Sequence, residues 1–463
     1  MPPIRARALD AWTDVRSSYW FIPTLMTLGA AVLAIGLTEV DRFVGAEWID
    51  AVSFLREGNK PDGARSFLAT VAGSMIGVAG VTFSITIASV VYATGQYGPR
   101  LLANFMDDRG NQVTLGTFIA TFLYCLLVLR TIRSADEGGA GVAGGEFVPH
   151  IAILTALALT LASIGVFIFF IHHVPESIHV SNLVAGVGRG LREHIGTLFA
   201  ERMGEDDPTP RAVRDDDTLT EMPSGFFEEA RRVAADGAGY LRALDADALM
   251  DLAVEHDLLL RVRRRPGDFV AERDTLVLAW PPDRVTDEAA SDVRTAFAWG
   301  AQRSAHQDVR FLVNELVEIA ARALSPGVND PFTAVSCLDW LSAALKDLAE
   351  REFPDATRYD EEGVLRVVAQ PTTFEEFVEG VYGQLRPYLA ADRNAALHAL
   401  ATIGEVAGRA TAPAQRDALR EQADAILQGA TDTLTLDADR AAVRERYREV
   451  ARLLAGRPGD RGR

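Results

Sequence analysis

The chain has 463 residues, of which 46 are basic and 64 acidic, giving a formal net charge of -18. An acidic balance of this size argues against binding of a nucleic-acid backbone as the main role. With 48% hydrophobic and 24% charged residues the chain is neither disordered nor collagen-like. Two cysteines, Cys125 and Cys337, exclude a disulfide framework and fit a reducing compartment.

Long stretches without a formal charge occupy the first 180 residues. They comprise 22 residues between Arg16 and Glu39, 34 between Arg65 and Arg100, 20 between Arg109 and Arg130, and 29 between Glu146 and Glu176. Each reaches the roughly 20 apolar residues that a helix needs to cross the hydrocarbon core of a bilayer. The sequence therefore predicts a four-helix transmembrane domain over residues 1–180, surrounded by lipid, with helices near 19–37, 67–92, 112–129 and 149–170.

The orientation of these spans does not follow from the charge bias. An even number of spans places both termini on one side, but the two sides carry seven and six basic residues near the membrane, so the positive-inside rule hardly distinguishes them. Exporting a disulfide-free tail of 283 residues without an export signal is the less economical arrangement. We therefore expect an inner (plasma) membrane protein with both termini in the cytoplasm.

The second span carries two unusual faces. At 100° per residue its small residues share one side, and its hydroxyl residues share another. Small residues allow a second helix to approach closely in lipid. Hydroxyls either bond back to carbonyls one turn earlier or line a water-filled path. We predict helix-packing or pore-lining roles for Gly73, Gly77, Gly80 and Ser84 on the small face and for Thr82, Thr86 and Ser89 on the hydroxyl face.

Histidines gather at the end of the fourth span. On a continuous helix His172, Glu176 and His179 would share one side, at spacings that suit a transition metal. Pro175 removes a backbone bond and should kink or end the helix there. Histidines that merely cap a span at the interface are commoner. We therefore predict no metal site, and no other pattern in the chain calls for a cofactor.

Beyond the spans, composition divides the chain into three segments. Residues 181–218 predict an amphipathic helix and an acidic linker, and residues 219–283 predict a small β module with short alternating strands and a turn at 265–268. Residues 284–463 predict a mostly helical remainder, so the C-terminal part is expected to be a cytoplasmic α+β domain. Within the β module, Arg261, Arg263, Arg264 and Arg265 indicate a solvated strand face or a contact with lipid headgroups or another anion.

One corner of the helical remainder combines a helix end with a helix start. Ser325-Pro326-Gly327 ends a helix, and Asp330-Pro331 begins the next, with aspartate as the N-cap. Asn329 and Asp330 there form either a tight corner or a place where backbone amides meet an anion. Together with Arg303 and Asp308 they are our predicted site for an anion or a protein partner.

The run from Ala323 to Ala334, ALSPGVNDPFTA, resembles the signature of a bacterial family of predicted membrane proteins, the domain of unknown function two-two-five-four. Further similar segments are residues 18–23, 96–102, the His172-His173 pair, Arg303-Ser304 with Gln307-Asp308, and 371–376, which together span nearly the whole chain. The family pattern has threonine at Ser304 and glutamine at His179, so it does not support His179 as a ligand. The resemblance implies an inner-membrane protein with a cytoplasmic C-terminal domain and implies no activity.

Two functions from different classes fit these observations. The first is a homo-oligomeric channel- or transport-like assembly, in which the second span meets its symmetry mates above a cytoplasmic regulatory domain. The alternative is a membrane-anchored regulatory or scaffold protein that binds a partner or small anion through that domain. No nucleophile elbow, phosphate loop or zinc helix motif is present, so we do not expect an enzyme.

Overall fold

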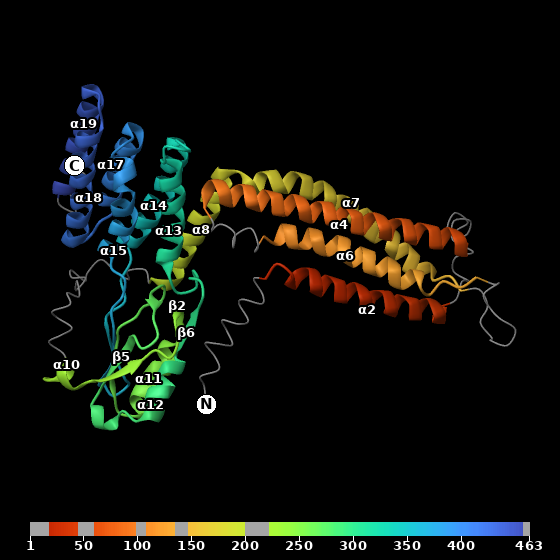
Figure 1. Ribbon diagram of the computed structural model, residues 1–463, viewed down its shortest axis with the longest axis horizontal. Coiled ribbons are helices and arrows are strands. Elements are labelled where there is room, and N and C mark those ends of the chain that lie inside the picture. Colours follow the sequence, from red (N-terminus) through yellow and green to blue (C-terminus); the bar gives the residue numbers. More distant parts are fainter. Residues whose placement is uncertain (1–17, 45–59, 99–107, 135–146, 200–221, 457–463) are drawn as a thin grey trace, which may run out of the picture. The chain divides into compact units, whose positions relative to one another are not determined.

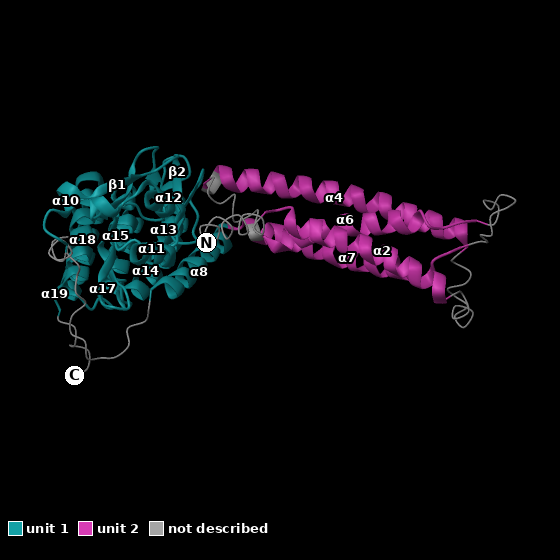
Figure 2. Cartoon of the chain, turned by 90° about the horizontal axis from the view of Figure 1, so that it is seen from below, with its two compact units in different colours: residues 1–12, 180–463 teal, residues 13–179 magenta. Residues whose placement is uncertain are grey.

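The computed structural model describes residues 18–44, 60–98, 108–134, 147–199 and 222–456. The chain divides into two compact units, residues 13–179 and residues 180–463, the second also including residues 1–12 (Figure 2). The boundary falls between the last long apolar helix and the amphipathic helix that follows it in sequence.

The N-terminal unit consists, in its described part, of four helices that lie side by side (Figure 1). They are α2 (Phe21–Val44), α4 (Pro61–Tyr97), α6 (Arg109–Leu129) and α7 (His150–Ile178). All four are long and apolar enough to cross a membrane, with mean hydropathy between 1.9 and 2.5 over their best windows. The predicted four apolar helices are confirmed, and each is longer than the range predicted for it.

The bundle core is apolar, and so is most of its outer surface. Side chains such as Leu68, Phe118, Cys125 and Val128 are fully buried between the helices. Large apolar side chains also point outward, among them Val32 and Ile168. Such a surface would be unusual for a protein in water but is normal against lipid tails.

Two carboxylates hold the ends of helices in this bundle. Asp108 caps α6 by accepting a hydrogen bond from the amide of Gly110 at 2.7 Å. Asp41 of α2 accepts bonds from the amides of Ile151 and Ala152 at 2.9 and 3.0 Å, which caps the N-terminus of α7. A side-chain carboxylate at a helix N-terminus satisfies otherwise unpaired amides and opposes the positive end of the helix dipole.

The C-terminal unit begins with the predicted amphipathic helix, α8 (Val180–Leu198), whose apolar face is buried. It packs against α13 (Val309–Ala323) and α14 (Pro331–Ala349). Gly188 lies directly beneath the ring of Trp340, where an added Cβ would come within 2.4 Å of ring carbon, so the close packing of α8 on α14 requires glycine. The predicted acidic linker falls at 200–221, outside the described residues.

Two small sheets share one apolar core in this unit. The five-stranded sheet has the order β1 (Arg231–Ala234), β5 (Thr275–Trp280), β3 (Leu259–Val262), β8 (Leu365–Ala369) and β7 (Thr357–Tyr359), and only β3 and β8 are parallel. The antiparallel three-stranded sheet has the order β4 (Phe269–Val270), β2 (Gly239–Leu244) and β6 (Phe297–Gly300). Leu241, Val277 and Phe297 pack with α11 (Ala246–Glu255) and α12 (Asp287–Thr295) in their common core.

The sheets extend beyond the segment in which the sequence placed its β module. Strands β1 to β5 lie within 219–283, but β6, β7 and β8 come from the segment predicted as mostly helical. Because β3 pairs with β8 about a hundred residues later in the chain, both segments contribute to one structure. The C-terminal unit is therefore an α+β domain with a small mixed sheet, in which the strands are not confined to one segment.

The remaining helices complete the unit. Short helical pieces are α10 (Phe226–Glu229) and the turn Pro282–Arg284. A further series consists of α15 (Phe374–Val378), a π-helical turn at Glu379–Gly383, α16 (Gln384–Leu389), α17 (Arg393–Ala407), α18 (Pro413–Thr433) and α19 (Asp437–Ala455). The predicted cap of α14 is confirmed, since Asp330 accepts a bond from the amide of Thr333. At the start of α15, Thr373 accepts a bond from the amide of Glu376.

Candidate functional site

The small-residue face of α4 points out of the bundle. No atom of the described residues, outside the helix itself, lies within 4 Å of the position that a Cβ would take at Gly73, Gly77 or Gly80. Ser84 is also exposed, and its hydroxyl donates to the carbonyl of Gly80 at 2.9 Å. This face is therefore not used for packing within the described part of the N-terminal unit.

The hydroxyl face of α4 points inward instead. Thr82 and Thr86 are 2% and 4% exposed, and Ser89 is half-buried. Thr86 donates to the carbonyl of Thr82 at 3.0 Å, which is the bond back to the preceding turn that the sequence left open as one alternative. The two faces of α4 thus have different surroundings, one the interior of the chain's own bundle and the other its outer surface.

The histidines at the end of α7 do not converge on a metal. His172 Nε2 lies 3.3 Å from the carboxylate of Glu176, with both side chains largely exposed, and the helix continues past Pro175 to Ile178. His179 is the C-cap, where the backbone leaves the helix. Among the residues that the structure describes, no three His, Cys, Asp or Glu side chains form a group that could hold a metal ion.

The predicted residues Arg303 and Asp308 form the centre of a buried ionic cluster. The carboxylate of Asp308 is 1% exposed and accepts hydrogen bonds from Arg303 Nε at 3.0 Å and Nη2 at 2.5 Å. Arg310 Nε approaches its other oxygen at 3.3 Å. Two guanidinium groups therefore surround one buried carboxylate, and Arg310 also pairs with Asp268 at 3.3 Å, so two carboxylates balance the two arginines.

The turn between β3 and β4 completes this cluster. Arg310 also donates to the carbonyl of Pro266 at 2.7 Å, and Asp268 accepts from the amide of Arg265 at 2.8 Å. Gly267 has a φ of 92°, and a Cβ there would lie 2.1 Å from Asp308 Oδ2. Only glycine allows the turn and the buried carboxylate to approach this closely.

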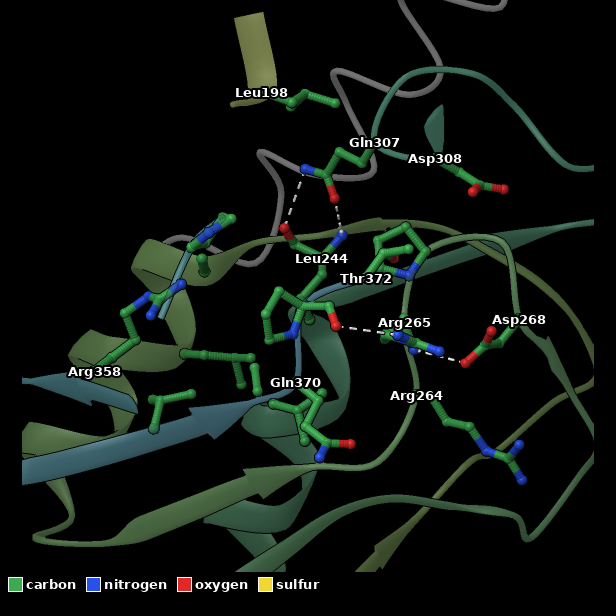
Figure 3. A pocket seen from close by; sticks show the side chains of 18 of the residues that line it. Leu198, Leu244, Arg264, Arg265, Asp268, Gln307, Asp308, Arg358, Gln370 and Thr372 are labelled. Atoms are coloured by element: carbon green, nitrogen blue, oxygen red, sulfur yellow. Dashed lines mark hydrogen bonds between the residues drawn. The ribbon is translucent and has the colours of Figure 1, made fainter. Parts of the chain in front are cut away.

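A cavity of about 830 Å³ borders the cluster (Figure 3). Its lining comes from the ends of α8, β2, β3 and β8 and from the loops at 263–268, 307–310 and 370–372. Gln307 fixes one wall, because its amide both accepts from the Leu244 amide at 2.8 Å and donates to the Leu244 carbonyl at 3.2 Å. A cavity of this size is typical of a small-molecule site.

Positive charge predominates around this cavity. Six arginines line it against three aspartates: Arg261, Arg263, Arg264, Arg265, Arg310 and Arg358, with Asp247, Asp268 and Asp308. Arg264 and Arg265 are paired with Asp274 and Glu376, outside the lining. Among the described residues neither Arg263 nor Arg358 has a carboxylate partner, and Arg358 donates only to backbone carbonyls, including that of Thr357 at 3.0 Å.

The other two predicted site residues lie elsewhere. Asp330 caps α14 and accepts from the hydroxyl of Thr333 at 2.5 Å, while Asn329 has a positive φ of 50°. These are the features of a tight corner between helices, the other alternative that the sequence left open, and neither residue lines the cavity. Sequence reasoning missed Gln307, Arg310 and Arg358 as parts of the site, although the arginine run at 261–265 and the segments at 303–308 and 371–376 pointed to it.

The fold and this site define a class of protein: four apolar helices of membrane-spanning length, followed by an α+β unit with an arginine-lined cavity. The chain belongs to the family described as Predicted membrane protein (DUF2254), which matches residues 16–405. It is 29% identical over 434 residues to uncharacterized proteins of Mycobacterium tuberculosis (strain ATCC 25618 / H37Rv) and Mycobacterium bovis (strain ATCC BAA-935 / AF2122/97). These alignments cover 93% of this chain and 79% of each relative. No solved structure matches.

Proposed function

We propose that the protein is a membrane-anchored receptor for a small anionic ligand, which binds in the cavity of the C-terminal unit. The observation that carries this proposal is the excess of guanidinium groups over carboxylates around an 830 Å³ cavity in a chain of net charge -18. An unneutralised guanidinium on a cavity wall favours an anionic occupant, because its planar fork matches carboxylate and phosphate oxygens.

The lining also indicates the shape of the ligand. Apolar side chains, including Leu249, Val262 and Phe377, also line the cavity. A site with both features suits a molecule that has an anionic group and an apolar or aromatic body. Inorganic anions would fill only the charged part of such a site.

A ligand in the cavity would contact the end of α8, the helix that follows the last apolar helix in sequence. Leu198 and Phe199, at the end of α8, line it, and α8 follows α7 in sequence with only His179 between them. Phe199 is held in place: its carbonyl accepts from Arg351 at 2.7 Å and its ring contacts those of Phe353 and Phe377. An occupant would thus touch the helix that continues from the last span.

The proposal is tested with the full-length protein in detergent, using inorganic pyrophosphate and adenosine monophosphate as probes at constant ionic strength. We expect both probes to raise the thermal midpoint, and the Arg263→Gln/Arg358→Gln variant to need at least about tenfold more probe for the same rise. Arg444→Gln, an exposed arginine of α19, is the matched control. Equal responses of the two variants, or no response of the wild type, would refute an anion site in this cavity.

A homo-oligomeric, channel- or transport-like assembly is a second candidate, favoured by the outward small-residue face of α4. In lipid such a face suits close packing against the same helix of another copy. Mass measurement in nanodiscs tests it: Gly77→Leu should reduce the oligomer, whereas Gly36→Leu on the exposed surface of α2 should not. A monomeric wild type would remove this candidate.

We also propose that both termini are cytoplasmic, which labelling of terminal cysteines in intact cells would check.

A further inference from the structure

Polar side chains are buried at one end of the membrane bundle. Thr82 and Thr86 of α4 and Asn111, Gln112 and Thr114 of α6 are all between 1% and 4% exposed. In a bundle of membrane-spanning helices, buried polar groups are costly and usually serve a purpose. None of them belongs to the anion cavity, which lies in the other unit.

These residues lie at the same level of the bundle. Arg65, near the start of α4, donates to the carbonyl of Ile132, just past the end of α6, at 3.0 Å, so the two helices run in opposite directions. Twenty-one residues separate Arg65 from Thr86, and the same number separates Ile132 from Asn111. Since each residue adds about 1.5 Å along a helix, Thr86 and Asn111 come level, and Thr82 lies about 6 Å, or about one turn, from them along α4.

A third element supports this placement. The ring of Tyr19, just before α2, lies 6.4 Å from that of Phe83 in α4 between centroids, and the amide of Asn111 donates to Asp108 Oδ1 at 3.4 Å. Tyr19 and Asp108 therefore border the same polar layer as Thr86. The layer consists of Tyr19, Thr82, Thr86, Asp108, Asn111, Gln112 and Thr114.

In the polar layer, Thr82 Oγ1 and Asn111 Oδ1 are shielded from solvent and have no hydrogen-bond partner among the described residues. The hydroxyl of Thr114, by contrast, donates to the carbonyl of Gly110 at 2.7 Å. A buried polar atom without a partner is costly, and a bound water or ion can supply the partner.

The charge of the surroundings selects the kind of ligand. An unpartnered amide oxygen can only accept, so it needs a hydrogen-bond donor or a cation. The carboxylate of Asp108, which accepts from the amide of Asn111 at 3.4 Å, is 18% exposed and lies 2.9 Å from His173 Nε2. Neutral oxygens beside a single carboxylate suit a monovalent cation, since divalent ions take several carboxylates and transition metals prefer nitrogen or sulfur.

Apolar side chains follow the polar layer along α4 and α6. Phe118, Ala79 and Met75 are buried in the bundle core beyond it. These side chains therefore add no ligand to the polar layer on that side.

From these observations we propose that the polar layer binds a small alkali cation, with Thr82 Oγ1 and Asn111 Oδ1 as direct ligands and Asp108 as the neighbouring negative charge. Bound in this way, the cation would fix the ends of α4 and α6 against each other. This site is independent of the anion cavity, and either can be absent without the other.

The test is thermal unfolding of the full-length protein in detergent, in chlorides of lithium, sodium, potassium or N-methylglucamine at equal ionic strength. We expect at least one alkali cation to raise the midpoint above that in N-methylglucamine, and this difference to vanish in Asn111→Leu and Thr82→Val. The difference between salts is the readout, because removing an unpartnered polar atom can itself stabilise the bundle.

Thr114→Val is the matched control, since its hydroxyl is already bonded within α6, and it should keep the cation effect. Equal midpoints of the wild type in all four salts would overturn the proposal. The same holds if Asn111→Leu and Thr82→Val retain the effect. Water access is tested with Asn111→Cys in a background without the native cysteines. If this thiol reacts with a water-soluble reagent while no salt has an effect, the layer holds water only, and the cation site is refuted.

Discussion

The two units bury carboxylates in different ways. In the C-terminal unit Asp308 is surrounded by the guanidinium groups of Arg303 and Arg310. In the membrane bundle Asp41 contacts, among the described residues, no arginine but two backbone amides at the start of α7. A helix terminus offers partial positive charge without a long side chain, whereas an arginine brings a full charge and several hydrogen-bond donors. The carboxylate of Asp41 therefore caps a helix, and that of Asp308 holds two arginines in place, of which Arg310 lines the cavity.

Removal of the Asp308 carboxylate should have the largest effect on stability. Asp308→Ala leaves two partly buried guanidinium groups facing each other, and breaking a buried ion pair of this kind costs about 3–5 kcal/mol. We expect a loss near the lower end, about 3 kcal/mol, because both arginines retain some contact with solvent. Denaturant unfolding of the full chain, followed by tryptophan fluorescence, measures it.

Asp432→Ala, an exposed acid near the end of α18, is the control and should change stability by less than about 0.5 kcal/mol. A loss below about 1 kcal/mol for Asp308→Ala would mean that the arginines relax into solvent and that the cluster is not rigid.

Removal of the charge of Asp41 should have a smaller effect. Asp41→Asn keeps the shape and one acceptor oxygen, so only the charge at the helix terminus is lost, which costs about 1–2 kcal/mol. Unfolding of the detergent-solubilised protein with increasing fractions of sodium dodecyl sulfate would measure it. Glu39→Gln, on the same helix and in an exposed pair with Arg42, should cost about 0.5 kcal/mol or less. If Asp41→Asn costs as much as Asp308→Ala, the contrast between the two ways of burying a carboxylate fails.

How well the sequence predicts each unit depends on how far apart in the chain the interacting residues are. The bundle helices follow from local composition, because a charge-free segment of sufficient length needs no knowledge of its neighbours. The start of α14 follows in the same way from Asp330 and Pro331. Strands β1, β6 and β7 have three or four residues each, and they exist only through pairing with distant strands, so no local pattern indicates them.

The candidate site shows the same division. Arg303 and Asp308 are five residues apart, and their association could be predicted from the sequence. Arg358 reaches the cavity only because β7 adds to β8, which itself pairs with β3. Asn329 and Asp330 were placed with the anion site because a helix N-terminus can bind anions, but their own side chains and backbone already complete that corner.

The smallest predicted effect concerns a second ion cluster of the α+β unit, which should respond to pH. Arg366 bonds to Asp257 at 2.6 Å and to Asp360 at 2.7 Å, and these bonds hold the pKa of both carboxyls below its usual range. A carboxyl whose pKa is lowered by folding contributes stability above its unfolded pKa, about 3.8–4, and loses it as the pH falls through the folded value. Arg366→Gln should therefore lower the thermal midpoint at neutral pH, and the gap to the wild type should close below about pH 4. Thermal scans between pH 7 and pH 3, with Arg409→Gln of the exposed Arg409–Glu350 pair as control, measure this gap. A gap that stays constant over this range would show that Arg366 stabilises the sheet edge by packing, and the ionic contrast with the bundle would then rest on Asp308 alone.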